Sequence, residues 1–363
     1  MALALLAMVS LHAGGVSPDR LARLTRGVNL AHWFWWAQGK DNEHKILRAK
    51  YGDADFAQMR AFGIRHVRLT LDPDLFFDET HPDQLKPEFL PDLDAALDLL
   101  LAHDLAVIVA PFPSKVFRAR FGFDKDDVLA REFATFWQAL AKHLAVKSPD
   151  YIFLEVMNEP SHGMSPQHWA SIQARLLAAM RAGAPRHTLI ANSNQGAGGA
   201  ELPPLKPFPD PNIIYDFHYY NLHTFTHQGT NPGKPGVSEI HGLVYPVDEA
   251  NKAQVAQGLS ATAQQLLADY NCSREVFAAD IGETAAWARR NNVAVICDEM
   301  GVYAGAPRES RYRWFMDVRQ ILESDHIGWA VWDYDSDNFG IAHPDHGQRT
   351  PDPAAFQALG LKL

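Results

Sequence analysis

The segment YIFLEVMNEPSHGMSPQHWASIQARLLAAMRA, residues 151–182, contains the unit from which we expect the whole fold to be built. It opens with a short apolar run from Tyr151 to Met157, passes through a polar turn, and continues with helical periodicity from Pro166 to Ala182. The apolar run does not alternate with polar residues, which is typical of a parallel strand covered on both faces. This segment therefore predicts a β-strand followed by an α-helix.

The same order recurs along the chain. Seven further apolar runs bounded by turn residues lie at Gly27–Leu30, Ile64–Leu71, Leu105–Ala110, Thr188–Asn192, Asn212–Tyr219, Asn292–Glu299 and Ile327–Tyr334. Helical periodicity separates most of them, at Asp53–Phe62, Pro91–His103, Asp127–Ala145, Lys252–Tyr270 and Arg308–Ser324, whereas residues 196–211 are rich in Gly and Pro and show none. Eight alternating β/α units favour a closed barrel, so we predict an α/β protein with a single (β/α)8 TIM barrel over residues 21–363.

Composition excludes several classes of partner. The formal net charge is −10, and no cluster of Lys or Arg suits nucleic acid or an anionic membrane. The chain has 9 Trp, 10 Tyr and 20 Phe, some of them in polar surroundings, where an aromatic ring can pack on the face of a neutral sugar. We therefore expect a polysaccharide or oligosaccharide substrate, no nucleic acid, no membrane and a monomeric enzyme.

Two further features bear on where the protein works. Residues 1–20 begin with the apolar run MALALLAMVSLHA, which is too short to span a bilayer and predicts a signal peptide and a secreted or periplasmic protein. The two cysteines, Cys272 and Cys297, are too few for a disulfide scaffold. We expect Cys297, which lies in the run VAVIC, to be a buried thiol, although export would also permit a bond between the two.

Two acidic residues stand where a barrel places its active site, at the carboxyl ends of strands. Glu159 follows the fourth predicted strand in LEVMNEPSH, and Glu299 ends the seventh in VAVICDEM. Glycosidic bond cleavage requires such a pair, one carboxylic acid to protonate the leaving oxygen and one carboxylate to attack or stabilise the anomeric carbon. The alternative is that each glutamate is a salt-bridge partner at a strand end.

Other predicted strand ends carry residues that suit the same site. Arg68 ends HVR in the second strand, where its charge can hold a nearby carboxylate ionised. His218 and Tyr220 close the sixth strand, and the tyrosine hydroxyl can hydrogen-bond a nucleophile. Trp332 ends the eighth strand and can stack on a sugar ring. Each of these residues alone also suits a packing or salt-bridge role.

At this point the sequence resembles glycoside hydrolase family five, the cellulase family. The motifs that carry the resemblance are RGVNL from Arg26, HVRLT from His66, NEP from Asn158, HYYN from His218, DEMG from Asp298 and GWAVWDY from Gly328. They occur in the family's order between about Arg26 and Gly340, covering nearly the whole chain after the leader. The ordered set is far more specific than the tripeptide NEP alone.

The resemblance implies a retaining hydrolase of a β-linked glucan, most closely an endo-β-1,4-glucanase. By position it implies Glu159 as acid/base, Glu299 as nucleophile and Asn158 as a partner of the sugar 2-hydroxyl, and it places Arg68, His218, Tyr220 and Trp332 around the sugar. The third strand departs from the family, because Ala110 and Phe112 stand where Asp and His are common. We expect Phe112, together with Trp33 and Trp36 of HWFWW, to supply stacking contacts instead.

Several alternatives remain open. The substrate can be another β-glycan such as β-1,3-glucan or mannan, and a transglycosylase would use the same covalent intermediate. The altered third strand also permits a carbohydrate-binding barrel without turnover. A metal-dependent hydrolase lacks support, because no HExxH or similar ligand spacing occurs, so we expect no metal and no cofactor. A retaining mechanism predicts carboxyl groups roughly 5 to 5.5 Å apart, against about 6.5 to 9.5 Å for inversion.

Overall fold

The structure is a computed structural model that describes residues 15–35, 43–123, 125–160, 163–193, 202–230, 234–345 and 348–363. The first fourteen residues of the predicted leader and Trp36 lie outside this range. Residues 15–20 belong to the folded body, because Val16 is buried and the first helix begins at Pro18. Within the described residues, no helix has both the length and the apolar character needed to cross a bilayer.

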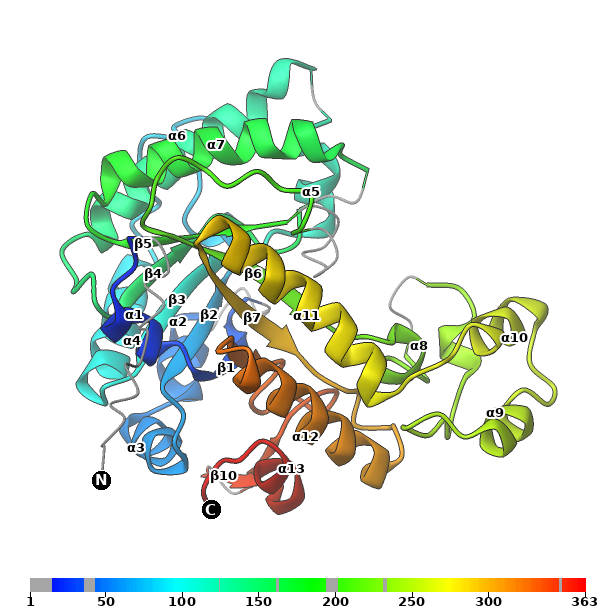
Figure 1. The fold of residues 1–363 in the computed structure, drawn as a ribbon. Helices are drawn as coiled ribbons and strands as arrows, with labels where there is room; N and C mark the ends of the chain where they lie inside the picture. Colours follow the sequence, from blue (N-terminus) through cyan, green and yellow to red (C-terminus); the bar gives the residue numbers. More distant parts are fainter. Residues whose placement is uncertain are drawn as a thin grey trace, which may run out of the picture.

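A closed barrel of eight parallel strands forms the centre of the molecule, which confirms the predicted fold class (Figure 1). Neighbours in sequence are neighbours in the barrel, and the first strand pairs with the last through Arg26–Trp329, Gly27–Ala330 and Val28–Val331. The strands are β1 Arg26–Phe34, β2 His66–Leu71, β3 Ala106–Pro111, β4 Ile152–Glu155, β5 Thr188–Asn192, β6 Ile213–Tyr219, β7 Ala294–Met300 and β8 Gly328–Val331. A further hairpin, β9 Ala342–Asp345 and β10 Gln348–Pro351, follows the barrel.

Helices surround the barrel and connect most of its strands. They are α1 Pro18–Arg23, α2 Glu43–Lys50, α3 Asp53–Phe62, α4 Leu90–Ala102, α5 Lys115–Arg120, α6 Val128–Leu144, α7 Pro166–Gly183, α8 His223–Thr226, α9 Glu249–Val255, α10 Ala261–Ala268, α11 Arg274–Asn291, α12 Arg308–Ser324 and α13 Pro353–Ala358. Short 3-10 turns lie at Pro73–Leu75, Lys125–Asp127 and Val237–Glu239. Between β5 and β6, the described residues 202–212 form no helix, in agreement with the absence of helical periodicity there.

The helices form where capping and periodicity coincide. Ser165 accepts a hydrogen bond from the His168 amide and is followed by Pro166 at the first position of α7, so the start of this helix is fixed by its sequence. In α6, Phe133, Trp137 and Leu140 share one buried face. The helices α6 and α7 pack against each other on the outside of the barrel (Figure 1).

The segment after β6 differs from the prediction. A single helix was expected over Lys252–Tyr270, but α9 and α10 are separate, because Gly258 adopts a left-handed conformation (φ 78°) and Ser260 caps a new helix by accepting from the Ala263 amide. These two helices belong to an insertion that extends away from the barrel (Figure 1). The helix leading into β7 is α11, which was not predicted.

The core has two parts. A large cluster fills the space between the strands and the surrounding helices. A smaller one lies where the strands begin and includes Ile108, Phe153 and Ile190, against which Val16 and Leu24 of the N-terminal segment pack. Both cysteines are buried free thiols, so the expected thiol is confirmed and a bond between them is not formed.

Candidate active site

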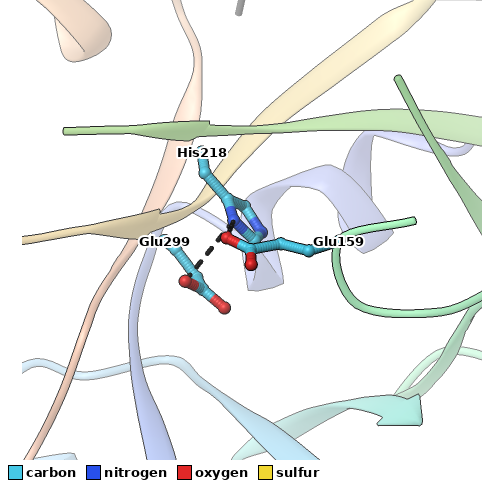
Figure 2. Close-up of side chains that lie close together, drawn as sticks. All are labelled: Glu159, His218 and Glu299. Carbon is cyan, nitrogen blue, oxygen red and sulfur yellow. Dashed lines mark hydrogen bonds and ion pairs between the residues drawn. The ribbon is translucent and has the colours of Figure 1, made fainter. Parts of the chain in front are cut away.

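Glu159 and Glu299 meet at the carboxyl end of the barrel. Glu299 lies within β7 and is 3% exposed, whereas Glu159 follows β4 and its side chain is 30% exposed. His218 of β6 lies between them, with Nδ1 at 3.2 Å from Glu159 Oε1 and 3.4 Å from Glu299 Oε2 (Figure 2). One oxygen of each carboxylate and one ring nitrogen of His218 all lie within 4.8 Å of one another. The two carboxylates and the His218 ring therefore form one cluster.

The backbone at Glu159 is strained. Its φ is 40°, in the left-handed region that residues with a β-carbon seldom adopt. Arg118 of α5 reaches this residue with Nη1, at 3.3 Å from the main-chain oxygen and 3.4 Å from Oε2. Strain of this kind persists where surrounding contacts fix the geometry, as they do here.

Arg68 of β2 is buried beneath the two glutamates and contacts several acceptors. Its Nη1 donates to Glu299 Oε1 at 2.5 Å, and its Nη2 donates to Asn158 Oδ1 at 2.8 Å. Nε and Nη2 also form a two-point contact with Glu155, at 2.7 Å each. Burial raises the pKa of Glu299, while the charges of His218 and Arg68 act in the opposite direction. The predicted contact between Arg68 and a carboxylate at the site is thus present in the structure.

Tyr220 and Asn158 also lie where the sequence placed them. The Tyr220 hydroxyl donates to Glu299 Oε2 at 2.9 Å. Asn158 is fully buried, its oxygen accepts from Arg68, and among the described residues its amide nitrogen has no hydrogen-bond partner. Because that nitrogen is itself buried, the expected contact of Asn158 with a sugar hydroxyl stays a prediction.

A β-bulge in β7 was not predicted. Phe217 pairs with Cys297, but the next residue of β6, His218, pairs with Glu299, so Asp298 is an extra residue on β7. Its carboxylate consequently faces the barrel interior, 3.3 Å from Arg68 Nε and 3.4 Å from His218 Nε2. Sequence spacing gives no sign of this bulge, because strand alternation would place Asp298 on the opposite face from Glu299.

Sequence reasoning also missed Asn29, Glu155 and Asp216, which are buried beside these residues. Asn29 accepts from Arg68 at 3.1 Å, and Asp216 Oδ2 lies 3.9 Å from His218 Nε2. For Glu155 and Asp216, the sequence did contain a signal: each is an acidic residue inside an otherwise apolar strand. Such a group is buried only where a partner charge or a proton compensates it.

The donor atoms at this site also have the spacing of a metal site. Glu159, His218 and Glu299 form one such group, and Asp216, His218 and Asp298 form another. His218 belongs to both, and Arg68 contacts Glu299 and Asp298, so positive charge is already supplied to these carboxylates by the protein. We assign neither group to a metal.

Comparison with known proteins identifies the family. The model of the cellulase family, glycosyl hydrolase family 5, matches residues 31–338. The chain belongs to this family. It is 25% identical over 325 residues to endoglucanase C of Acetivibrio thermocellus, covering 88% of this chain and 93% of that protein, and 20% identical over 310 residues to cellodextrinase A of Ruminococcus flavefaciens, covering 84% and 83%.

Solved structures share the fold. Endoglucanase Cel5A of Thermotoga maritima superimposes with a TM-score of 0.77 at 22% identity, covering 95% of this chain and 100% of that one. The barrel thus agrees with the fold of a solved relative, and this family 5 protein is a glycoside hydrolase.

Aromatic residues line one side of the site in this family 5 enzyme. Phe112, at the end of β3, stacks on Trp332 with ring centroids 5.5 Å apart and planes at 21°. The ring centroid of Trp35 lies 4.1 Å from that of Phe112 and 6.2 Å from that of Trp332. Phe112 is only 8% exposed and packs against both tryptophans, so the structure gives its ring little surface for the expected stacking on a sugar.

The expectation for Trp33 is wrong. Its side chain is 3% exposed, its indole nitrogen donates to the Leu47 carbonyl at 2.8 Å, and it packs against Tyr51 and Phe56 in the core. Trp33 lies in the part of β1 where the register with β2 shifts, between Leu30 and Phe34, so the direction of its side chain could not be predicted from strand alternation. Trp35, which was not predicted, contacts the aromatic residues of the site, while Trp36 lies outside the described residues.

Proposed function

We propose that this family 5 glycoside hydrolase cleaves β-1,4-glucan within the chain and with retention of anomeric configuration, using Glu159 as acid/base and Glu299 as nucleophile. The observation that carries the proposal is the close approach of the two carboxylates around His218, within 4.8 Å. Oxygens this close suit the roughly 5 to 5.5 Å separation of the carboxyl groups in retaining enzymes.

In the first step, the Glu159 carboxylic acid protonates the glycosidic oxygen while a Glu299 oxygen attacks the anomeric carbon. The bond to the leaving sugar breaks and a covalent glycosyl-enzyme forms. In the second step, Glu159 removes a proton from water, the water oxygen bonds to the same carbon, and Glu299 is released. Two inversions at one carbon give net retention.

Hydrogen-bond donors on both sides hold the Glu299 carboxylate in place. Arg68 donates to Oε1 of Glu299, whereas Tyr220 donates to Oε2. These donors fix the orientation of the carboxylate before substrate binds, which lowers the entropic cost of attack. Trp332, which is partly exposed and packs on the buried Phe112, offers an apolar ring that suits the CH face of a glucosyl ring.

The nucleophile is tested by Glu299→Gly. Turnover should be abolished, and added azide should restore part of it by forming an α-glycosyl azide, since azide replaces the missing carboxylate on the opposite face of the sugar. Glu159→Gln serves as the matched variant, which should lose activity without giving this product. A β-glycosyl azide, or turnover near the wild-type rate in Glu299→Gly, contradicts the assignment.

The substrate is tested by one panel of polymers: carboxymethyl cellulose, barley β-glucan, laminarin, mannan and xylan. Preference for the first two, with viscosity falling faster than reducing ends appear, supports internal cleavage of β-1,4-glucan. Preference for laminarin or mannan reassigns the linkage. Binding without release of sugar from any polymer favours the carbohydrate-binding alternative.

A further inference from the structure

The extra residue on β7 creates a second tier of charge beneath the two glutamates. Asp298 is fully buried, and its Oδ1 lies 3.4 Å from His218 Nε2 while its Oδ2 lies 3.3 Å from Arg68 Nε. On the other side of the same ring, His218 Nδ1 faces one oxygen of Glu159 and one of Glu299. His218 thus has carboxylates at both ring nitrogens.

This placement determines which protonation state of His218 fits. A neutral imidazole carries one N–H and one lone pair, so either Nδ1 would direct its lone pair at the two glutamates or Nε2 would direct its lone pair at Asp298. Only the imidazolium donates in both directions. Nδ1 meets hydrogen-bond geometry with Glu159, and Nε2 has an ion-pair contact with Asp298 at 3.4 Å. Carboxylate oxygens on both sides of the ring therefore favour a ring with two protons.

We propose that Asp298 is a positioning residue that holds His218 as an imidazolium, so that the Nδ1–H of His218 is shared between Glu159 and Glu299. The inference rests on the proposed roles of these two glutamates. It assigns Asp298 no contact with substrate. Its effect is transmitted through His218, which fixes the distance between the two carboxylates.

The electrostatic balance around His218 agrees with this assignment. The groups that face or surround the ring are Arg68 from β2, Glu155 and Glu159 from β4 and its loop, Asp216 from β6, and Asp298 and Glu299 from β7. Burial opposes the charged ring, but Glu299, Asp298 and Glu159 together raise the pKa of His218 well above its usual value.

The two aspartates near Nε2 differ in charge. Burial opposes ionisation of Asp298, yet Arg68 and His218 lower its pKa below the usual value. Burial and the neighbouring carboxylates Asp298 and Glu155 instead raise the pKa of Asp216 well above the usual range. Among the described residues, the oxygens of both aspartates and His218 Nε2 lack a hydrogen-bond partner, so the contacts that distinguish the two aspartates are ion-pair distances. Asp298 contacts Arg68 and lies closer to His218 Nε2 than Asp216 does, so Asp298 is the counter-ion. The raised pKa of Asp216 favours its neutral form.

The experiment measures the His218 ring directly, by nitrogen NMR of protein labelled in its histidines, with the His218 signals assigned by their loss in His218→Gln. In the wild type, both ring nitrogens should stay protonated from about pH 5 to about pH 8. In Asp298→Asn, the ring should lose a proton at a pH lower by about one to three units, the effect of a close opposite charge. The alkaline limb of kcat/KM, which reports Glu159 as the proposed acid, should also move to lower pH, because a His218 charge no longer balanced by Asp298 stabilises the Glu159 carboxylate.

Two further variants make the test specific. Asp216→Asn should leave the His218 titration at its wild-type position, because it replaces a neutral acid with a neutral amide. Asp280→Asn is the control for activity, since Asp280 accepts from Tyr219 on the outer side of β6, away from the ring. It should leave the pH profile unchanged.

Three results overturn the proposal: a neutral His218 ring in the wild type at about pH 6, a ring in Asp298→Asn that keeps both protons over the whole range, or a shift in Asp216→Asn as large as that in Asp298→Asn. The wild-type spectrum decides the first even if Asp298→Asn does not fold. Because the NMR measurement needs no turnover, it also separates this inference from the proposed function, which fails instead if the wild type hydrolyses no glycan.

Discussion

The two oxygens of Glu299 have different partners, so Arg68 and Tyr220 each hold one side of the carboxylate. Oε1 accepts from the buried guanidinium of Arg68, while Oε2 accepts from the Tyr220 hydroxyl and faces His218. Held from both oxygens, the carboxylate that we propose as nucleophile cannot rotate freely, so removing one donor should affect catalysis more than binding.

Tyr220→Phe tests this point. The variant removes one hydrogen bond to a charged group, worth about 1.5 to 3 kcal/mol, so kcat/KM should fall about 10- to 100-fold with KM little changed. Tyr312→Phe is the control, because Tyr312 also donates to a carboxylate, Asp352, but far from the site. Steady-state kinetics on one soluble glucan measure both. An equal loss in the two variants would argue for a general effect on folding.

At this scale, the sequence located residues at strand ends more readily than those inside the barrel. His218 and Tyr220 lie at the end of β6, where parallel topology alone brings them to the site, whereas Arg68 lies inside β2 and was the one interior residue that was predicted. Asp298 could not be placed, since its inward direction depends on a change of register between β6 and β7. A contact that depends on a bulge is a property of two paired strands and is not visible in either sequence alone.

Among the elements, the strands were easier to predict than the connections between them. The expected helices Asp53–Phe62 and Arg308–Ser324 agree with α3 and α12 at both ends. The helix α11 was missed although its signals are present: Ser273 accepts from the Val276 amide, and Phe277, Ile281 and Ala288 share a buried face. The predicted helix was instead placed in the long insertion that precedes α11.

Close packing between α6 and α7 leads to a prediction about a glycine. A β-carbon at Gly183 would lie 2.4 Å from the Gln138 carbonyl oxygen and 2.8 Å from the Lys142 amide nitrogen. These are backbone atoms of α6, so the two helices would have to separate. Gly183→Ala should therefore destabilise the protein by about 1 to 3 kcal/mol, despite the higher helix propensity of alanine.

Gly282→Ala is the matched control in α11. A β-carbon there has no heavy atom within 4 Å, so the substitution should stabilise the protein by about 0.5 to 1 kcal/mol. Urea unfolding of both variants measures the two effects. If Gly183→Ala were as stable as Gly282→Ala, the close approach of α6 and α7 would be contradicted.

The molecule as a whole carries part of its charge inside the barrel, and this affects stability as a function of pH. Burial raises the pKa of Glu155 to about 7, although Arg68 opposes the shift. The folded state therefore binds a proton that the unfolded state has already released, and the free energy of unfolding falls as pH rises from the usual glutamate pKa towards 7. Each pH unit in this window costs up to about 1.4 kcal/mol.

Glu155→Gln should make this dependence shallower. The amide cannot ionise, so the decrease in stability between about pH 4.5 and about pH 7 should be smaller than in the wild type, even if the variant is less stable throughout. Urea unfolding at a series of pH values gives the slope. Glu309→Gln, at an exposed position of α12, should keep the wild-type slope. Identical slopes for Glu155→Gln and the wild type would contradict the assignment.

The position of the two glutamates on different halves of the barrel has a practical consequence. Glu159 follows β4 and Glu299 belongs to β7, so a chain divided between β5 and β6 would leave one carboxylate on each fragment. Neither fragment alone would possess the chemistry that we propose, whereas their docking would restore it. Fused to two interacting partners, such fragments would turn sugar release into a reporter of association.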